Sequence, residues 1–165
     1  MFEQLDYVYM PSGDVAADVT YFTEVLGGRL VFAIDGMGTR VAMVALTEDP
    51  PRILLAGHLE GDTPVLVYRV ADLATATGDL AARGWTQGHT LEIPQGPVCS
   101  FTAPGGQRLA IYELMRPGVE ASFVGRRDFN AFDIAQDHCL DVTVFVVIKQ
   151  GCDHRLVFRI VRQVL

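Results

Sequence analysis

Along the chain, segments in which hydrophobic residues recur at every second position alternate with segments in which they recur at helical spacing. The same order of segments occurs twice. Each copy begins with a segment rich in β-branched and aromatic residues, Leu5–Met10 in the first and Val65–Val70 in the second, which predicts a strand. An aspartate follows each strand, Asp14 or Asp72, and precedes apolar residues at helical spacing. These aspartates are therefore the predicted helix N-caps.

The two predicted helices present apolar residues three or four positions apart, and each is followed by glycine, which often ends a helix. After each helix the pattern returns to a period of two in three short segments, which predicts three strands. The helical apolar faces comprise Val15, Val19, Phe22 and Leu26 before Gly27 and Gly28, and Leu73, Ala76, Leu80 and Ala81 before Gly84. The predicted strands cover residues 29–34, 40–46 and 53–57, and residues 90–93, 98–102 and 109–113. Each copy thus has the order βαβββ, over about residues 5–58 and 64–114.

Two short motifs accompany this duplication. Leu5-Asp6-Tyr7-Val8 lies before the first helix, and Pro104-Gly105-Gly106-Gln107-Arg108-Leu109-Ala110-Ile111-Tyr112 closes the second copy. With them the chain resembles, over residues 5–129, the vicinal oxygen chelate superfamily of glyoxalases, bleomycin-resistance proteins and extradiol dioxygenases. The resemblance implies an α+β domain over residues 1–129, in which both modules share one cupped mixed sheet with the helices on its convex face. It also implies that the concave face holds a metal or a small ligand, and that the protein forms a homodimer.

Metal-dependent members of the superfamily place His, Gln or Glu at four positions, in the first and last strand of each module. The resemblance places these positions at Tyr7, Leu55, Val65 and Ala110. Aliphatic side chains cannot bind a metal ion, and a catalytic site needs about three protein ligands from His, Asp, Glu or Cys. We therefore expect neither a metal ion nor another cofactor in this domain, and we assign no catalytic residue.

Strand alternation predicts which side chains face the concave side, because successive residues of a strand point to opposite faces. Arg69 follows Val65 and Val67 on the inward face, where a guanidinium needs a carboxylate or a ligand oxygen as its partner. We predict that Arg69 anchors a ligand; a structural ion pair, or an arginine that reaches solvent, is the alternative. The candidate ligand-binding residues are Tyr7, Tyr9, Met43, Arg69, Phe101 and Tyr112, although ordinary core packing would also account for the aromatic ones.

Three functions are compatible with this sequence. The first, implied by the resemblance to drug-sequestering proteins, is a metal-free protein that binds a small aromatic, cationic or neutral molecule in the concave cavity. The second is a glyoxalase-like or dioxygenase-like enzyme that acts on a small carbonyl compound with a non-standard site. The third is a structural or regulatory dimer whose concave face is filled by its own side chains. We favour the first because three of the four metal positions are aliphatic.

The composition narrows the choice of partners. The chain has 165 residues, with 13 basic and 20 acidic side chains and a net charge of −7. Such acidity disfavours a nucleic-acid surface, which needs clustered lysine and arginine, and favours cationic or neutral ligands. No apolar run approaches the ~18 residues of a membrane span. We expect a cytoplasmic protein without nucleic-acid or membrane partners, because the N-terminus lacks a signal-peptide pattern and the 3 cysteines suit a reducing compartment.

The last part of the chain, residues 130–165, lies beyond the resemblance. Residues 142–148 and 155–161 are strongly apolar and are joined by a Gln150-Gly151-Cys152-Asp153 turn, which predicts a β-hairpin extension. So apolar a hairpin has to pack on the domain, dimerise or aggregate; alternatively, these residues are not an evolved part of the domain. A zinc site across this hairpin, formed by His138, Cys139, Cys152 and His154, is a further alternative, but their spacing matches no standard zinc finger.

Overall fold

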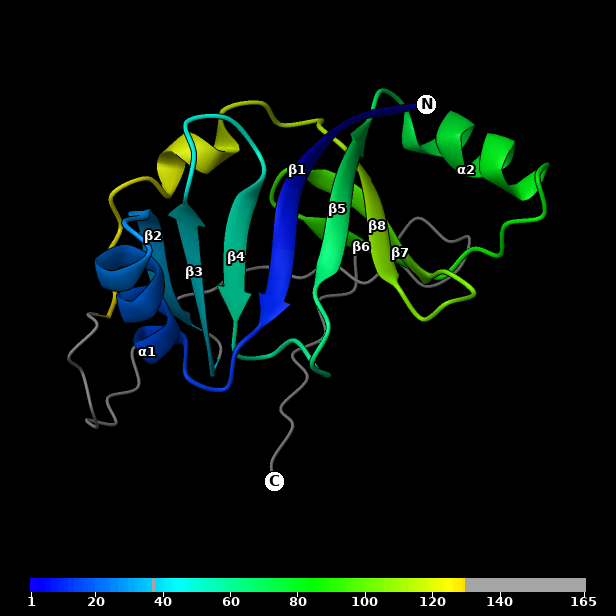
Figure 1. Ribbon diagram of the computed structural model, residues 1–165. Coiled ribbons are helices and arrows are strands. Elements are labelled where there is room, and N and C mark those ends of the chain that lie inside the picture. The colour runs from blue at the N-terminus through cyan, green and yellow to red at the C-terminus, as the bar shows by residue number, and fades with distance from the viewer. Residues whose placement is uncertain (37, 130–165) are drawn as a thin grey trace.

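A computed structural model describes residues 1–36 and 38–129, so the predicted C-terminal hairpin and its His and Cys residues lie outside the described residues. Eight strands form one mixed sheet in the order β2-β3-β4-β1-β5-β8-β7-β6 (Figure 1). The first module contributes β1 (Phe2–Pro11), β2 (Arg29–Gly36), β3 (Thr39–Ala45) and β4 (Arg52–Ala56). The second contributes β5 (Val65–Val70), β6 (His89–Ile93), β7 (Gly96–Thr102) and β8 (Arg108–Glu113). The predicted α+β class and the βαβββ order of both modules are confirmed.

The two modules meet where β1 pairs antiparallel with β5 in the centre of the sheet. Inside each module the first strand pairs in parallel with the last, β1 with β4 and β5 with β8. Because β1 and β5 run in opposite directions, β4 and β8 begin at opposite ends of the sheet. The register places Arg52 opposite Tyr7 and, at the equivalent position of the second module, Arg108 opposite Val65.

Both helices begin at the predicted aspartates. The backbone N–H of Ala17 donates to the Asp14 carboxylate at 3.1 Å, and that of Thr75 donates to Asp72 at 2.6 Å. The helices that follow are α1 (Val15–Thr20), which packs on β3 and β4, and α2 (Leu73–Ala81), which packs on β7 and β8 (Figure 1). Within the described ranges, neither helix has the length and apolar character needed to cross a membrane.

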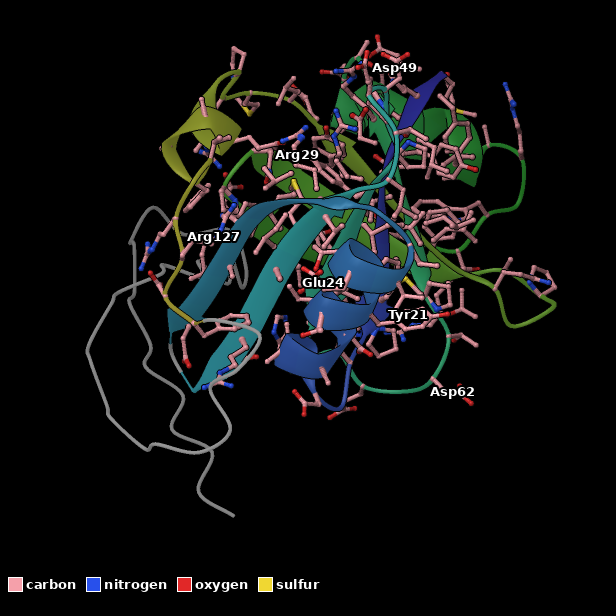
Figure 2. The ribbon with its side chains drawn as sticks, turned by 60° about the vertical axis from the view of Figure 1, so that its left-hand side comes forward. Tyr21, Glu24, Arg29, Asp49, Asp62 and Arg127 are labelled. Atoms are coloured by element: carbon pink, nitrogen blue, oxygen red, sulfur yellow. The ribbon has the colours of Figure 1, made fainter. Side chains whose placement is uncertain are left out.

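The first helix departs from its predicted pattern in its last turn. Tyr21–Val25 forms a π-helix directly after α1, and Figure 2 shows Tyr21 and Glu24 on it. A π-turn contains more residues than an α-turn, so the following residues rotate away from the face that a 3.6-residue period assigns. Phe22 still packs against the sheet, but Leu26 is 48% exposed. The prediction that Leu26 is buried is wrong for this reason.

The sheet separates two apolar layers. On the convex face, α1 covers one cluster that includes Val44 and Leu55, and α2 covers another that includes Cys99 and Ile111. On the concave face a single cluster extends across both modules. Its buried members include Tyr7, Phe32, Met43, Val65, Val67, Ala110 and Tyr112.

Two inward assignments made from the sequence are wrong. Leu55 lies under α1 on the convex face, and its neighbour Leu54 packs with the concave cluster. A one-residue error in strand phase moves a side chain to the other face of the sheet. Phe101 also faces the convex side, two residues after the buried Cys99, and its ring packs edge-to-face on Trp85 with 5.1 Å between centroids.

After β8 the chain crosses the concave face and reaches the outer edge of β2. The crossing segment, residues 114–124, contains a short 3₁₀ helix at Val119–Ser122, and Phe123 packs on Phe32 with 5.8 Å between ring centroids. Arg127 then donates to the carbonyls of Leu30 and Val31 at 2.7 and 2.9 Å (Figure 2). The end of the described chain thus protects the outer edge strand of the sheet.

Candidate functional site

A cavity of about 220 Å³ lies at the concave face beside the crossing segment. Because a water needs only about 10–15 Å³ of such volume, the cavity has room for several waters or a small organic molecule. Its polar walls come from four neighbouring strands, the turn before β7 and the crossing segment. The polar residues include Asp6, Tyr7, Arg52, Arg69, Tyr112 and Glu120.

Asp6 reaches this cavity because β1 is irregular. The register between β1 and β5 shifts between Leu5 and Tyr7, so β1 has one extra residue there. Regular alternation would send Asp6 and Tyr7 to opposite faces, but at this bulge both line the cavity, and Asp6 is only 7% exposed. Leu5, on the other side of the bulge, lies opposite Tyr68 of the convex layer.

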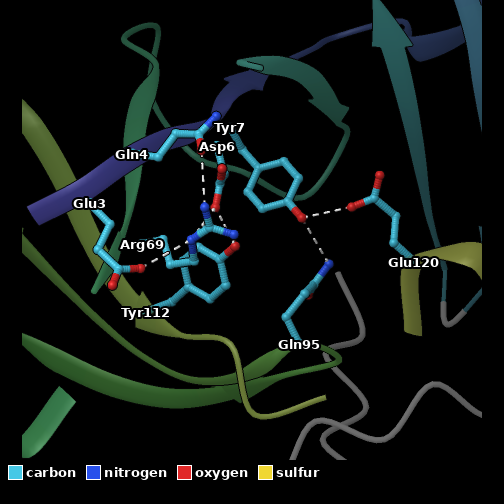
Figure 3. Close-up of polar contacts among 8 residues, drawn as sticks. All are labelled: Glu3, Gln4, Asp6, Tyr7, Arg69, Gln95, Tyr112 and Glu120. Carbon is cyan, nitrogen blue, oxygen red and sulfur yellow. Dashed lines mark hydrogen bonds and ion pairs between the residues drawn. The ribbon is translucent and has the colours of Figure 1, made fainter. Parts of the chain in front are cut away.

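The Asp6 carboxylate joins Tyr112 to Arg69. The Tyr112 hydroxyl donates to Asp6 Oδ2 at 2.6 Å, and Arg69 Nε lies 3.6 Å from the same oxygen (Figure 3). Arg69 Nε also lies 3.3 Å from the Glu3 carboxylate, and Nη2 donates to Gln4 at 3.0 Å. Burial first, and then the hydrogen bond to Asp6, raises the pKa of the Tyr112 phenol. Arg69 therefore faces the cavity as predicted, and carboxylates of its own chain balance its charge.

Tyr7 forms a second phenol–carboxylate pair on the cavity wall. Its hydroxyl donates to Glu120 Oε2 at 2.8 Å, and Gln95 Nε2 lies 3.5 Å from the same phenol oxygen (Figure 3). Burial, followed by the hydrogen bond to Glu120, raises the pKa of Tyr7 well above its usual value. The phenol stays protonated, and the carboxylates and phenol oxygens retain acceptor capacity for a ligand hydroxyl or N–H.

Tyr9 belongs to a separate polar cluster of the concave face. Its hydroxyl lies 2.7 Å from His58 Nε2, and His58 Nδ1 lies 3.1 Å from Thr39 Oγ1. Burial raises the pKa of Tyr9 to about 12 and lowers the pKa of His58. A neutral imidazole that accepts from Tyr9 through Nε2 carries its proton on Nδ1, facing Thr39.

The superfamily's metal positions do not fit a metal ion in this chain. Val65 and Ala110 pack in the concave cluster, and Leu54 rather than Leu55 is the inward residue of β4. Tyr7 supplies the one oxygen at these positions, and its hydroxyl donates to Glu120. Nowhere in residues 1–36 and 38–129 do three His, Cys, Asp or Glu side chains form a group that could hold an ion. This donor set is too poor for a catalytic divalent metal.

The structure brings together half of the predicted ligand-binding residues. Tyr7, Arg69 and Tyr112 line the cavity, whereas Tyr9 and Met43 belong to the concave cluster without being among its lining residues. The prediction for Phe101 is wrong, because its side chain lies on the opposite face of the sheet. Whether any of these residues binds a ligand stays a prediction.

Asp6, Arg52 and Glu120 are among the cavity residues that sequence reasoning missed. The β1 bulge reverses the orientation of Asp6, and Glu120 lies in a segment without a periodic pattern. The phase error in β4 that misplaced Leu55 also hid Arg52. A signal for Asp6 was available, because a carboxylate inside an apolar strand needs a buried partner.

No protein-family model matches the sequence, and no curated protein matches it. The structure is similar to methylmalonyl-CoA epimerase from Mycobacterium tuberculosis, with a TM-score of 0.60 and 20% identity over 73% of this chain and 93% of that one. The Streptomyces coelicolor epimerase in complex with 2-nitronate-propionyl-CoA gives 0.56 and 15%, over 70% of this chain and 100% of that one. A catechol 2,3-dioxygenase gives 0.52 and 17%, over 68% of this chain and 41% of that one. At these identities the likeness concerns the fold alone.

Proposed function

We propose that this protein, which has the vicinal oxygen chelate fold, binds a small molecule in the concave cavity without the help of a metal ion. The observation that carries the proposal is the cavity of about 220 Å³, whose walls include Tyr7, Arg69 and Tyr112. A concave site with a few convergent polar groups is the usual form of a small-molecule site. Binding in a dimer, which the resemblance implies, is a further part of the proposal.

The polar wall favours this function over a cup that serves only as a filled core. Asp6 and Tyr112 are almost completely buried and depend on each other for a hydrogen bond. Replacing a buried polar group of this kind by well-packed apolar side chains is often neutral or stabilising. A cavity with polar walls is therefore less favourable for stability than an apolar core. Ligand binding would account for such walls, whereas a purely structural role would not.

A ligand screen by thermal shift, run in buffer with EDTA, tests the proposal. A ligand present at 100 times its Kd stabilises the folded state by about 2.7 kcal/mol, which is readily measured. Leu114→Trp places a large side chain at the cavity wall and should abolish the shift, whereas Leu46→Trp, at a residue that is 44% exposed, is the matched control. Shifts that appear only with an added divalent metal, or that survive Leu114→Trp in a folded variant, would contradict the proposal.

An enzyme acting on a small carbonyl compound is the second candidate, and one observation favours it. Two carboxylates, Asp6 and Glu120, accept hydrogen bonds from phenols in the same cavity, an arrangement that can also move a proton to or from a bound molecule. Incubation of the protein with small carbonyl compounds in D₂O, followed by NMR, tests it. Deuterium incorporation above that of an Asp6→Asn variant would support an enzyme.

A further inference from the structure

The arginines that line the cavity differ in how their charges are balanced. Arg69 lies 3.3 Å from the Glu3 carboxylate, and Arg116 forms an ion pair with Glu92. For Arg52, no carboxylate oxygen within the described part of the chain lies within 4.0 Å of the guanidinium. Arg52 is therefore a lining arginine whose charge no such ion pair balances.

The loop before β4 holds the Arg52 guanidinium in place through backbone carbonyls. Nη1 donates to Thr47 O at 2.6 Å and to Asp49 O at 3.2 Å, and Nη2 donates to Glu48 O. These bonds use three of the five N–H groups of a guanidinium. The side chain is thus fixed before any ligand arrives, which lowers the entropy lost on binding. The carbonyl groups are neutral, so the positive charge remains.

The unused donors of Arg52 suit a carboxylate. Among residues 1–36 and 38–129, Nε–H and one hydrogen of Nη2 have no acceptor. Nε and Nη2 form one edge of the planar guanidinium, and this edge matches the two oxygens of a carboxylate in bidentate geometry. Arg52 lies opposite Tyr7 in the sheet, so a molecule held here extends along the cavity wall toward Arg69 and Tyr112.

We propose that the cavity takes a small monocarboxylate whose two oxygens bind the Nε–Nη2 edge of Arg52. This inference rests on the proposed function and names the ligand class of the same site. A single carboxylate is preferred, because Asp6 and Glu120 on the same walls would repel a second negative charge. The net charge of −7 does not oppose such a ligand strongly, since exposed charges more than about 8 Å away are largely screened at physiological ionic strength.

Arg108 provides a control for the structural part of this arrangement. It occupies the position of Arg52 in the second module, and its Nη1 donates to the carbonyls of Glu60 and Thr63 at 2.7 and 3.0 Å. Both arginines therefore hold a loop, but Arg108 is not among the residues that line the cavity. Arg108→Gln removes the same charge and the same kind of loop contact without touching the site.

Isothermal titration of the full chain, in EDTA buffer, tests the proposal with acetate, pyruvate, lactate and the neutral amide lactamide. We expect lactate or pyruvate to bind and lactamide to bind far more weakly. Arg52→Gln should weaken carboxylate binding about ten- to hundredfold, from the typical strength of a hydrogen bond between charged groups. Arg52→Lys should recover only part of it, because an ammonium cannot bind both oxygens in one plane. Arg108→Gln should leave the affinity unchanged.

Several outcomes would overturn the carboxylate assignment. One is equal binding of lactate and lactamide to the unaltered protein, a comparison that holds even if Arg52→Gln fails to fold; the proposed function would survive it. A second is carboxylate binding that Arg52→Gln leaves intact. A third is inorganic phosphate binding more tightly than every carboxylate with the same dependence on Arg52. If neither these probes nor any compound of the thermal-shift screen binds, the proposed function fails together with this inference.

Discussion

The hydrogen bond from Tyr112 to Asp6 should contribute measurably to the stability of the fold. Tyr112 is 1% exposed and Asp6 is 7% exposed, and their oxygens are 2.6 Å apart. Tyr112→Phe removes one oxygen, and Arg69 at 3.6 Å is then the remaining polar partner of the buried carboxylate within the described part of the chain. A hydrogen bond to a charged group is worth about 1.5–3 kcal/mol. We therefore expect the free energy of unfolding to fall by about that amount.

Urea denaturation followed by circular dichroism measures this change, and Tyr68→Phe is the matched control. Tyr68 is half-buried on the convex face, and no side-chain hydrogen bond of its hydroxyl is present among the described residues. The control should change the free energy of unfolding by less than about 0.5 kcal/mol. A loss below about 0.5 kcal/mol for Tyr112→Phe would refute the reasoning, because it would mean that water replaces the phenol at Asp6.

Three further predictions concern backbone space and pH. Gly78 lies inside α2, and a Cβ added there would meet no atom within 4 Å, so Gly78→Ala should raise the free energy of unfolding by about 0.5–1 kcal/mol in urea denaturation. Gly96 has a φ of +155°, and a Cβ there would lie 2.2 Å from Glu113 O, so Gly96→Ala should lower it by about 2 kcal/mol or more in the same assay. Burial lowers the pKa of His58 in the folded protein. The neutral His58 side chain therefore contributes fully to the free energy of unfolding above the usual histidine pKa of about 6.5, and this contribution is lost as the pH falls through the lowered pKa of the folded state. An NMR titration of His58 should therefore give a pKa below the usual histidine value.

The fold was predictable because the same pattern of one strand, one helix and three strands occurs twice in the sequence. The aspartate N-caps and the return to a period of two behind each helix define two βαβββ modules, and the structure confirms them. The errors in the fold are local and have physical causes. The π-helix at Tyr21–Val25 changes the number of residues per turn, so Leu26 turns to solvent. Periodicity alone assumes a constant turn and cannot register such a change.

The site was harder to predict because it depends on interactions between distant parts of the chain. Arg69 faces the cavity as its strand phase predicts, but the phase does not reveal that Glu3 and Asp6 already balance its charge. The contact with Asp6 requires the bulge in β1, which breaks the alternation on which the prediction was based. Glu120 reaches Tyr7 from 113 residues away, from a segment whose sequence has no periodic pattern. The sequence therefore predicts that Arg69 faces the cavity, but it predicts neither the other charged residues of the site nor which charges remain available.

The internal duplication explains why the two equivalent arginines lie in different surroundings. Arg52 and Arg108 begin β4 and β8 at opposite ends of the sheet. Arg52 holds the loop before its own strand, whereas Arg108 holds the linker before β5. The linker after the first module leads directly into β5. As far as residue 129, the chain after β8 adds no further strand to the sheet; it folds back over the Arg52 end and places Glu120 beside Tyr7. The cavity thus arises from the order of the modules along the chain, and a carboxylate site would be expected at Arg52 and not at Arg108 even though the two strands begin alike.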